Sequence, residues 1–344
     1  MKRTLTLLIL ALPALITLAM VRPAEAATCY RSSARSSCSV SAPKPAFSAP
    51  QQRTDSILDG AIYGWIEDYA RFYDAPEGQR AWQPSTGFFY GPAAEVATSD
   101  DGKRWYKVWG DWLPERYYHI VEASTFAGVE VNVQPQRPFG WVLRRFVPRP
   151  APGAEPGAGS AELQRYDFVQ VYNTARDAGG GIWYDVGQER WLRHDAVALL
   201  RLRQPPDGVE AGEYWVDVDL TQQTFAAYEG RRMVYAGLVS SGLPRWPTRL
   251  GLYTVWQRHV TTPMEGGERG DDYYYIDAVP HTMYFDGDIA LHGAFWHDDF
   301  GRPKSHGCVN MPPLAAEWIY YWSEDAPNDL RVWVHNSNYG EFLQ

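Results

Sequence analysis

One cysteine, Cys308, lies in a short segment whose neighbours suit it to nucleophilic chemistry. Residues 305–310 read Ser-His-Gly-Cys-Val-Asn, and Leu-His-Gly precedes them at 291–293. A thiol attacks an acyl carbon as the thiolate, so it needs a base, a group that orients the base, and donors for the oxyanion. The sequence offers all three.

Each of these roles has a predicted residue. His292 ends an apolar run and is the expected base, and Gly293 leaves a backbone carbonyl accessible to orient its ring. Gly307 lets the backbone bend so that its amide and that of Cys308 converge on an oxyanion. His306 is too close in sequence to Cys308 to be an obvious base, so we predict that it shapes the loop.

A zinc site is the alternative interpretation of the same residues. His292, His306 and Cys308 could bind the metal together with Asp298 or Asp299. Zinc sites commonly show CxxC or HExxH spacing, and neither motif occurs here. We therefore favour the nucleophile and expect no metal or other cofactor.

The N-terminus indicates export. Two basic residues at 2–3, an apolar run over 5–20 and a small-x-small site at 24–26 are typical of a signal peptide spanning residues 1–26. A retained membrane anchor is the alternative, but the apolar run is short for a spanning helix. We expect an enzyme that is cell-envelope associated or extracellular and meets the membrane only transiently during export.

The other two cysteines, Cys29 and Cys38, are close enough in sequence to bridge each other in an oxidising compartment. The alternative is that both are unpaired thiols in a flexible tail. If they are bridged, Cys308 is the odd thiol.

Composition favours a β-rich protein. The 344 residues include 15 Trp and 22 Tyr, and 30 Gly and 25 Pro interrupt short apolar runs, as expected for many short strands. The net charge of -9 argues against nucleic acid or anionic lipid as the main partner, because either would require a basic surface.

Composition shifts divide the chain into parts. We predict a Ser/Pro/Ala-rich tether at 27–55, a β module at 56–147, a linker at 148–160, a second β module at 161–206 and a catalytic domain at 212–340.

The two β modules contain a short internal sequence repeat. Trp-Tyr-Lys-Val at 105–108 followed by Trp-Leu at 112–113 resembles Trp-Tyr-Asp-Val at 183–186 followed by Trp-Leu at 191–192. The second copy resembles a bacterial SH3-like barrel, and the first does so more loosely. Core packing is the expected role of any single Trp in these copies, with ligand contact as the alternative.

After residue 208 the pattern predicts mainly strands. Only residues 312–322 have the pattern of a helix, with prolines suited to its first turn and three apolar residues, Trp318, Ile319 and Trp322, expected on one face.

The catalytic segment resembles the L,D-transpeptidase catalytic domain, also called YkuD. Its signature is a histidine, a spacer and then Ser/Thr-His-Gly-Cys-hydrophobic-Asn/Arg, which His292 and residues 305–310 match with a short spacer. The stretch at 240–253 resembles a further family motif. The resemblance runs from about Glu213 to the C-terminus and implies a β-rich domain with one helix after the catalytic cysteine.

The resemblance also implies roles for individual residues. Cys308 is similar to the family nucleophile, His292 to its base and Gly293 to the residue whose backbone orients that base. Three further positions are implied near the substrate: Trp296 as an aromatic wall, Tyr284 as a donor near the oxyanion, and Asn310. For Tyr284 an aromatic core position on a strand is the alternative, and we favour it. The polar segment 258–272 resembles the family's mobile loop over the cleft.

The implied reaction is acyl transfer on peptidoglycan stem peptides through a Cys308 thioester. An amine acceptor gives a crosslink, and water would make the enzyme an L,D-carboxypeptidase. Acylation by carbapenems is also implied. A non-catalytic envelope-binding protein is the alternative from another class, and the free thiol argues against it, because an unpaired cysteine outside the cytoplasm is reactive.

We expect the N-terminal cysteines to be dispensable for catalysis. Replacing both Cys29 and Cys38 with Ser should leave turnover unchanged, because the Ser- and Pro-rich sequence around them cannot build a site. A steady-state assay of the double variant checks this, and a large loss of turnover in a folded protein would contradict it.

Overall fold

The protein is mainly β. The computed structural model describes residues 27–32, 35–40, 45–157 and 159–339, the first two ranges for the backbone only, so the predicted signal peptide at 1–26 lies outside the described residues. The chain divides into two compact units, Met1–Lys44 and Pro45–Gln344. Among the described residues there is one α-helix, α1 (Pro313–Trp322), and it is too short to cross a membrane.

The first unit contains an antiparallel hairpin of β1 (Ala27–Ser32) and β2 (Arg35–Val40). Its register places Cys29 directly opposite Cys38. Directly opposed residues of antiparallel strands have the spacing that a disulfide spans. The bridge itself stays a prediction.

Two seven-stranded sheets form the catalytic part of the second unit. The first has the order β22 (Gly251–Thr254), β27 (Arg331–His335), β19 (Tyr214–Asp219), β20 (Thr224–Glu229), β21 (Arg232–Leu238), β12 (Val129–Val131) and β3 (Phe47–Ser48). The second has the order β11 (Tyr118–Ile120), β4 (Ile62–Ile66), β7 (Phe88–Ala93), β24 (Tyr274–Asp286), β25 (Ile289–Gly293) and β26 (Val309–Met311), with β23 (Gln257–Gly266) also paired to β24.

The main hydrophobic core joins these sheets to α1. It contains residues of β19, β20 and β21 from the first sheet, of β24, β25 and β26 from the second, and Ala315, Ala316 and Ile319 from the helix. Ile319 is fully buried in this core, and the partly buried Trp318 and Trp322 pack against it. The helix is followed by a 3-10 turn, η3 (Ser323–Asp325).

The two N-terminal modules are small antiparallel sheets. The first has the order β6 (Arg80–Trp82), β5 (Phe72–Tyr73), β10 (Asp111–Pro114), β9 (Arg104–Val108) and β8 (Glu95–Thr98). The second combines β14 (Phe168–Gln170), β13 (Phe139–Val142) and β18 (Val197–Leu200) with a sheet of β15 (Asn173–Arg176), β16 (Ile182–Asp185) and β17 (Trp191–Arg193).

The internal sequence repeat corresponds to a repeated order of secondary-structure elements. In the first module β9 and β10 are followed by a 3-10 turn, η1 (Glu115–Tyr117), and β11, and in the second β16 and β17 are followed by η2 (His194–Ala196) and β18. Trp105 and Trp183, the first residues of the two copies, are both buried. Packing is therefore sufficient to explain these two tryptophans.

Strand pairings of the second module cross the domain boundaries that the sequence predicts. Strand β13, which falls in the predicted first module, pairs with β14 and β18 of the second. Within the predicted linker, Arg149 forms a β-bridge with Trp191. The second module therefore begins before the Pro/Gly-rich stretch, which lies inside it as a loop.

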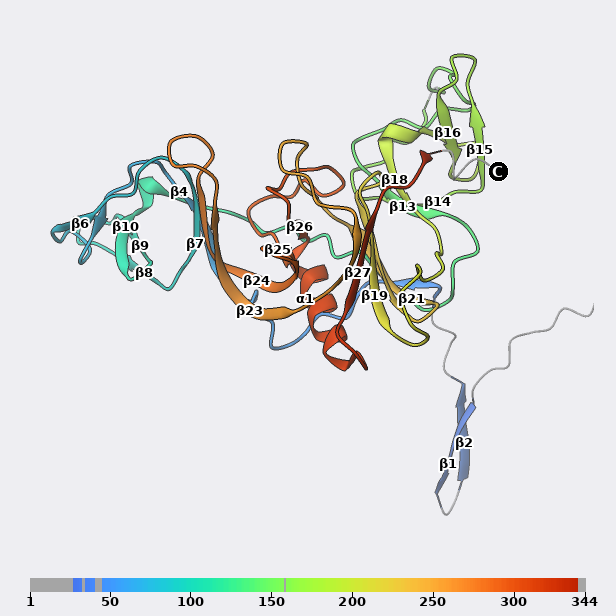
Figure 1. The fold of residues 1–344 in the computed structure, drawn as a ribbon, viewed down its shortest axis with the longest axis horizontal. Helices are drawn as coiled ribbons and strands as arrows, with labels where there is room; N and C mark the ends of the chain where they lie inside the picture. The colour runs from blue at the N-terminus through green and yellow to red at the C-terminus, as the bar shows by residue number, and fades with distance from the viewer. Residues whose placement is uncertain (1–26, 33–34, 41–44, 158, 340–344) are drawn as a thin grey trace, which may run out of the picture. The chain divides into compact units, whose positions relative to one another are not determined.

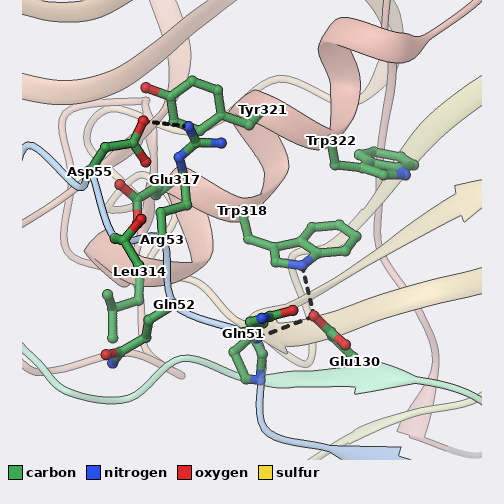
Figure 2. Close-up of a pocket in the computed structure, with 12 residues that line it drawn as sticks. Gln51, Gln52, Arg53, Asp55, Glu130, Leu314, Glu317, Trp318, Tyr321 and Trp322 are labelled. Atoms are coloured by element: carbon green, nitrogen blue, oxygen red, sulfur yellow. Dashed lines mark hydrogen bonds and ion pairs between the residues drawn. The ribbon is translucent and has the colours of Figure 1, made fainter.

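The end of the predicted tether packs against the catalytic part. Strand β3 pairs with β12, and residues 50–55 cross α1 beside a cavity of about 550 Å³ (Figure 2). There the Arg53 guanidinium lies 3.8 Å from the ring centroid of Tyr321, and Glu130 accepts hydrogen bonds from the Trp318 indole (3.1 Å) and the Gln51 amide (3.3 Å). Residues 47–55 thus contact β12 and α1, although the side chains of residues 51–55 stay exposed.

The predicted mobile loop at 258–272 is mostly a strand. Residues 257–266 form β23, which pairs with β24 in a long curved hairpin whose tip lies beside β7 (Figure 1). A Cβ at Gly266 would lie 2.8 Å from the Tyr274 hydroxyl, and Gly267 has a φ of +76°. A side chain at residue 266 would thus require the Tyr274 ring to shift, and one at residue 267 would be strained by the positive φ.

Trp215 is a sensitive point of the catalytic core. Its side chain is fully buried, stacks on Tyr228 at 4.1 Å and donates to the Gly230 carbonyl at 2.7 Å. Trp215→Ala should lower the free energy of unfolding by about 3–5 kcal/mol, because it leaves a large cavity. Trp256→Ala, at an indole that is 60% exposed, is the control and should change it by about 0.5 kcal/mol or less. Urea unfolding measures both, and equal effects would contradict this packing.

Candidate active site

Two adjacent parallel strands bring His292 and Cys308 together. Strand β25 pairs with β26 so that Leu291 lies opposite Val309 and His292 opposite Asn310. Cys308 immediately precedes β26. Both residues line a cavity of about 480 Å³, and Cys308 is partly exposed to it while His292 is buried.

The His292 ring is oriented by the backbone. Its Nδ1 lies 3.2 Å from the carbonyl oxygen of Gly293. If the neutral ring carries its proton on Nδ1, it donates there and leaves Nε2 free to accept a proton. A Cβ at residue 293 would lie 2.9 Å from Cγ of Pro280, so only glycine fits this position.

Trp296 completes the surroundings of the base. Its ring stacks on that of His292 with centroids 5.6 Å apart and an interplanar angle of 27°. It also lines the cavity, at the place where the sequence predicted an aromatic wall. The stacked indole limits the rotation of the imidazole and shields it from water.

The cysteine loop is held by the segment 240–248. Ser240 and Asn310 exchange two backbone hydrogen bonds of 2.8 and 2.9 Å. The Thr248 hydroxyl donates to the Gly307 carbonyl at 2.7 Å. Gly307 has a φ of +123°, which favours glycine, so these bonds fix a turn that places the thiol at the start of β26.

The oxyanion prediction needs a correction at Gly307. Its amide donates to the Ser305 hydroxyl at 3.1 Å, and that hydroxyl donates in turn to the Cys308 carbonyl. The Gly307 amide is thus already hydrogen-bonded to the Ser305 side chain within the turn. Of the two amides predicted to converge, only that of Cys308 remains a candidate oxyanion donor.

His306 connects the cysteine loop to the tip of the β23–β24 hairpin. Its ring packs on Trp246 with centroids 4.0 Å apart and lies 5.1 Å from the ring of Tyr274. Its Nε2 is 3.8 Å from Oδ2 of Asp272. These contacts fit the predicted role in shaping the loop.

Tyr284 lies outside the cavity lining. On β24 it pairs with Ala290, and its ring packs 5.8 Å from that of Trp256. The tyrosine that lines the cavity is Tyr274, earlier on the same strand. Burial raises the pKa of both phenols, and the nearby Cys308 raises them further, so both hydroxyls keep their protons.

His297 is a site residue that sequence reasoning missed. It is buried, lines the cavity, accepts from the Asp299 amide at 3.1 Å through Nδ1, and has Nε2 3.0 Å from the side-chain amide of Asn310. Burial lowers its pKa to about 3, so it is neutral. The sequence did offer one indication of His297, because it lies only five residues after His292.

Three further lining residues carried no sequence signal. Tyr274 sits in a run of aromatic residues, and Phe88 and Tyr90 lie in the first N-terminal module. Nothing in the sequence relates that module to the cavity.

Burial keeps both members of the central pair uncharged. It raises the pKa of the Cys308 thiol to about 11, an effect that the neighbouring Asp288 adds to and a backbone hydrogen bond with Ala290 opposes. Burial also lowers the pKa of the His292 imidazole to about 4, against a smaller opposing effect of the Gly293 carbonyl. At neutral pH the pair is thiol and imidazole, so the proton moves during the attack on substrate.

The two aspartates of the zinc alternative have other partners. Asp298 accepts hydrogen bonds from the hydroxyls of Ser124 and Tyr166, and Asp299 pairs with Arg165 at 3.2 Å. Across the described part of the chain, no group of three or more His, Cys, Asp or Glu side chains is arranged to hold a metal ion.

Comparison with known proteins identifies the domain that carries this site. The family model of the YkuD L,D-transpeptidase catalytic domain matches residues 213–334. This part of the chain belongs to that family. The chain as a whole has no match among curated proteins.

Solved structures of L,D-transpeptidases are also similar to the chain. The Enterococcus faecium L,D-transpeptidase C442S mutant is 22% identical over 36% of this chain and 50% of its own, with a TM-score of 0.32, so the match spans half of that protein. The Mycobacterium smegmatis L,D-transpeptidase is 19% identical over 62% and 99%, with a TM-score of 0.34. The E. faecium catalytic domain acylated by ertapenem is 22% identical over 37% and 100%, with a TM-score of 0.32.

The pKa of His292 predicts an unusual pH dependence. Because burial lowers it from 6.5 to about 4, the base stays unprotonated to lower pH than an exposed histidine. The second-order rate of Cys308 acylation should therefore be flat from about pH 6 to 8 and fall only as the pH drops through about 4 to 5. Stopped-flow measurement across this range checks it, and a half-maximal rate near pH 6.5 would contradict it.

Proposed function

We propose that the chain is an exported L,D-transpeptidase that crosslinks peptidoglycan stem peptides through a thioester on Cys308. The observation that carries this proposal is the placement of Cys308 and a backbone-oriented, neutral His292 in one cavity, within a domain of the L,D-transpeptidase family. A neutral imidazole can accept the thiol proton, and a protonated one cannot.

The first half of the reaction forms the thioester. Nε2 of His292 takes the Cys308 proton as the sulfur attacks the carbonyl carbon before the terminal D-residue of the donor stem. The C–N bond to that residue breaks, and the proton passes from His292 to the departing amine. The Cys308 amide and the protonated phenol of Tyr274 are the proposed donors near the oxyanion.

The second half resolves the thioester. The amine of a neighbouring stem attacks the acyl carbon, His292 takes its proton, and the Cys308 thiolate leaves and is reprotonated. Water in place of the amine gives the L,D-carboxypeptidase reaction. Trp296 and Asn310 are positioning residues for Cys308 and His292. Trp296 packs on the His292 ring, and the Asn310 backbone holds β26 to Ser240.

Incubation of the purified protein with tetrapeptide stem fragments tests the proposal. Mass analysis should find dimers whose mass shows loss of one terminal residue, and Cys308→Ala should produce none. His292→Ala should lower the rate by at least about 100-fold while keeping the melting temperature, because general-base catalysis is lost. Shortened monomers without dimers would show a carboxypeptidase, and unchanged fragments would leave the envelope-binding alternative.

A further inference from the structure

The first N-terminal module is joined to the catalytic sheet by a parallel strand pair. Strand β7 pairs with β24, with Phe88 opposite Tyr274 and Tyr90 opposite Ile276. Because side chains alternate along a strand, Phe88 and Tyr90 share one face of β7, and Phe89 between them faces the other way. Phe89 is buried in the core of the module.

That shared face is directed to the catalytic cavity. Phe88 and Tyr90 line it together with Met264 and Ile276 of the hairpin. Trp296, which stacks on the catalytic base, is also in this lining, and its ring centroid is 6.4 Å from that of Tyr90. The module therefore contributes side chains to the same cavity as Cys308.

Exposure shows that packing does not account for Phe88. Its side chain is 60% exposed, whereas its neighbour Phe89 is only 4% exposed. Its backbone amide is used, since it donates to the Tyr273 carbonyl at 2.9 Å and fastens the start of β7 to the hairpin tip. An exposed aromatic ring that lines a cavity, on a backbone held by a hydrogen bond, is suited to contact with a ligand.

The cavity is lined by side chains of two chemical kinds. Phe88, Tyr90, Met264 and Ile276 are apolar or aromatic, and Asp272, Lys304 and Asn310 are polar. An acyl donor whose side chain contains a run of methylene groups fits such a lining, because the methylenes can pack on the aromatic rings while polar ends bind the polar groups.

We infer that β7 forms a wall of the acyl-donor site, with Phe88 and Tyr90 as specificity-determining residues that contact the aliphatic side chain of the donor residue before the cleaved bond. The module is then part of the active site. This inference rests on the proposed function and extends it to the donor side chain.

Steady-state kinetics of the full chain with stem fragments test the inference. Phe88→Ala and Tyr90→Ala should each lower kcat/KM about tenfold, mainly through KM, as expected when an apolar contact with substrate is lost. Tyr90→Phe should keep the wild-type value, because the ring makes the contact. Tyr172→Ala, at a ring of the second module that is 53% exposed and outside the cavity lining, is the control and should change nothing.

Two further measurements separate substrate contact from a structural role. Alkylation of Cys308 by iodoacetamide, which is too small to need the wall, should proceed at the wild-type rate in Phe88→Ala, and the melting temperature should be unchanged. Wild-type kcat/KM in both alanine variants, or an equal fall in alkylation rate and melting temperature, would overturn the inference. An inactive wild-type protein would instead refute the proposed function itself.

Discussion

The parallel pairing of β25 with β26 is the contact on which the site depends. Its register places His292 opposite Asn310, and Cys308, which immediately precedes β26, lines the same cavity as His292. Neighbouring contacts hold this pair of strands: the backbones of Ser240 and Asn310 exchange two hydrogen bonds, and Gly293 lets Pro280 and Pro313 approach. A sheet gives Cys308 and His292 a fixed separation that a loop could not supply.

Burial then decides the chemistry of the pair. Transfer of a charge into surroundings of low dielectric is unfavourable, so the thiol and the imidazole both stay neutral before substrate arrives. The proton can move when the sulfur becomes bonded to carbon, because the negative charge then develops on the acyl oxygen near hydrogen-bond donors. The Trp296 ring packs on the His292 ring, and β7 pairs with β24 of the hairpin.

The sequence was sufficient for many of the strands around the candidate site, because their patterns are local. Strands were predicted after residue 208, where β19, β20 and β21 lie, and the paired prolines predicted the start of α1. The roles of Cys308 and His292 stay predictions, and the structure places both residues in the lining of one cavity. The failures involve contacts between distant segments. The segment 258–272 was expected to be a loop from its resemblance to the family, yet residues 257–266 pair with β24 and form a strand. Phe88 and Tyr90 reach the cavity only because β7 pairs with β24, and no local pattern encodes that pairing.

We propose that Cys308 is a nucleophile activated within this cavity. Intact-protein mass spectrometry after incubation with a carbapenem tests this proposal, because the acyl-enzyme retains the mass of the β-lactam. One adduct is expected on the wild-type protein and none on a folded Cys308→Ala variant. An adduct on Cys308→Ala, or a wild-type protein that stays unmodified, would contradict it.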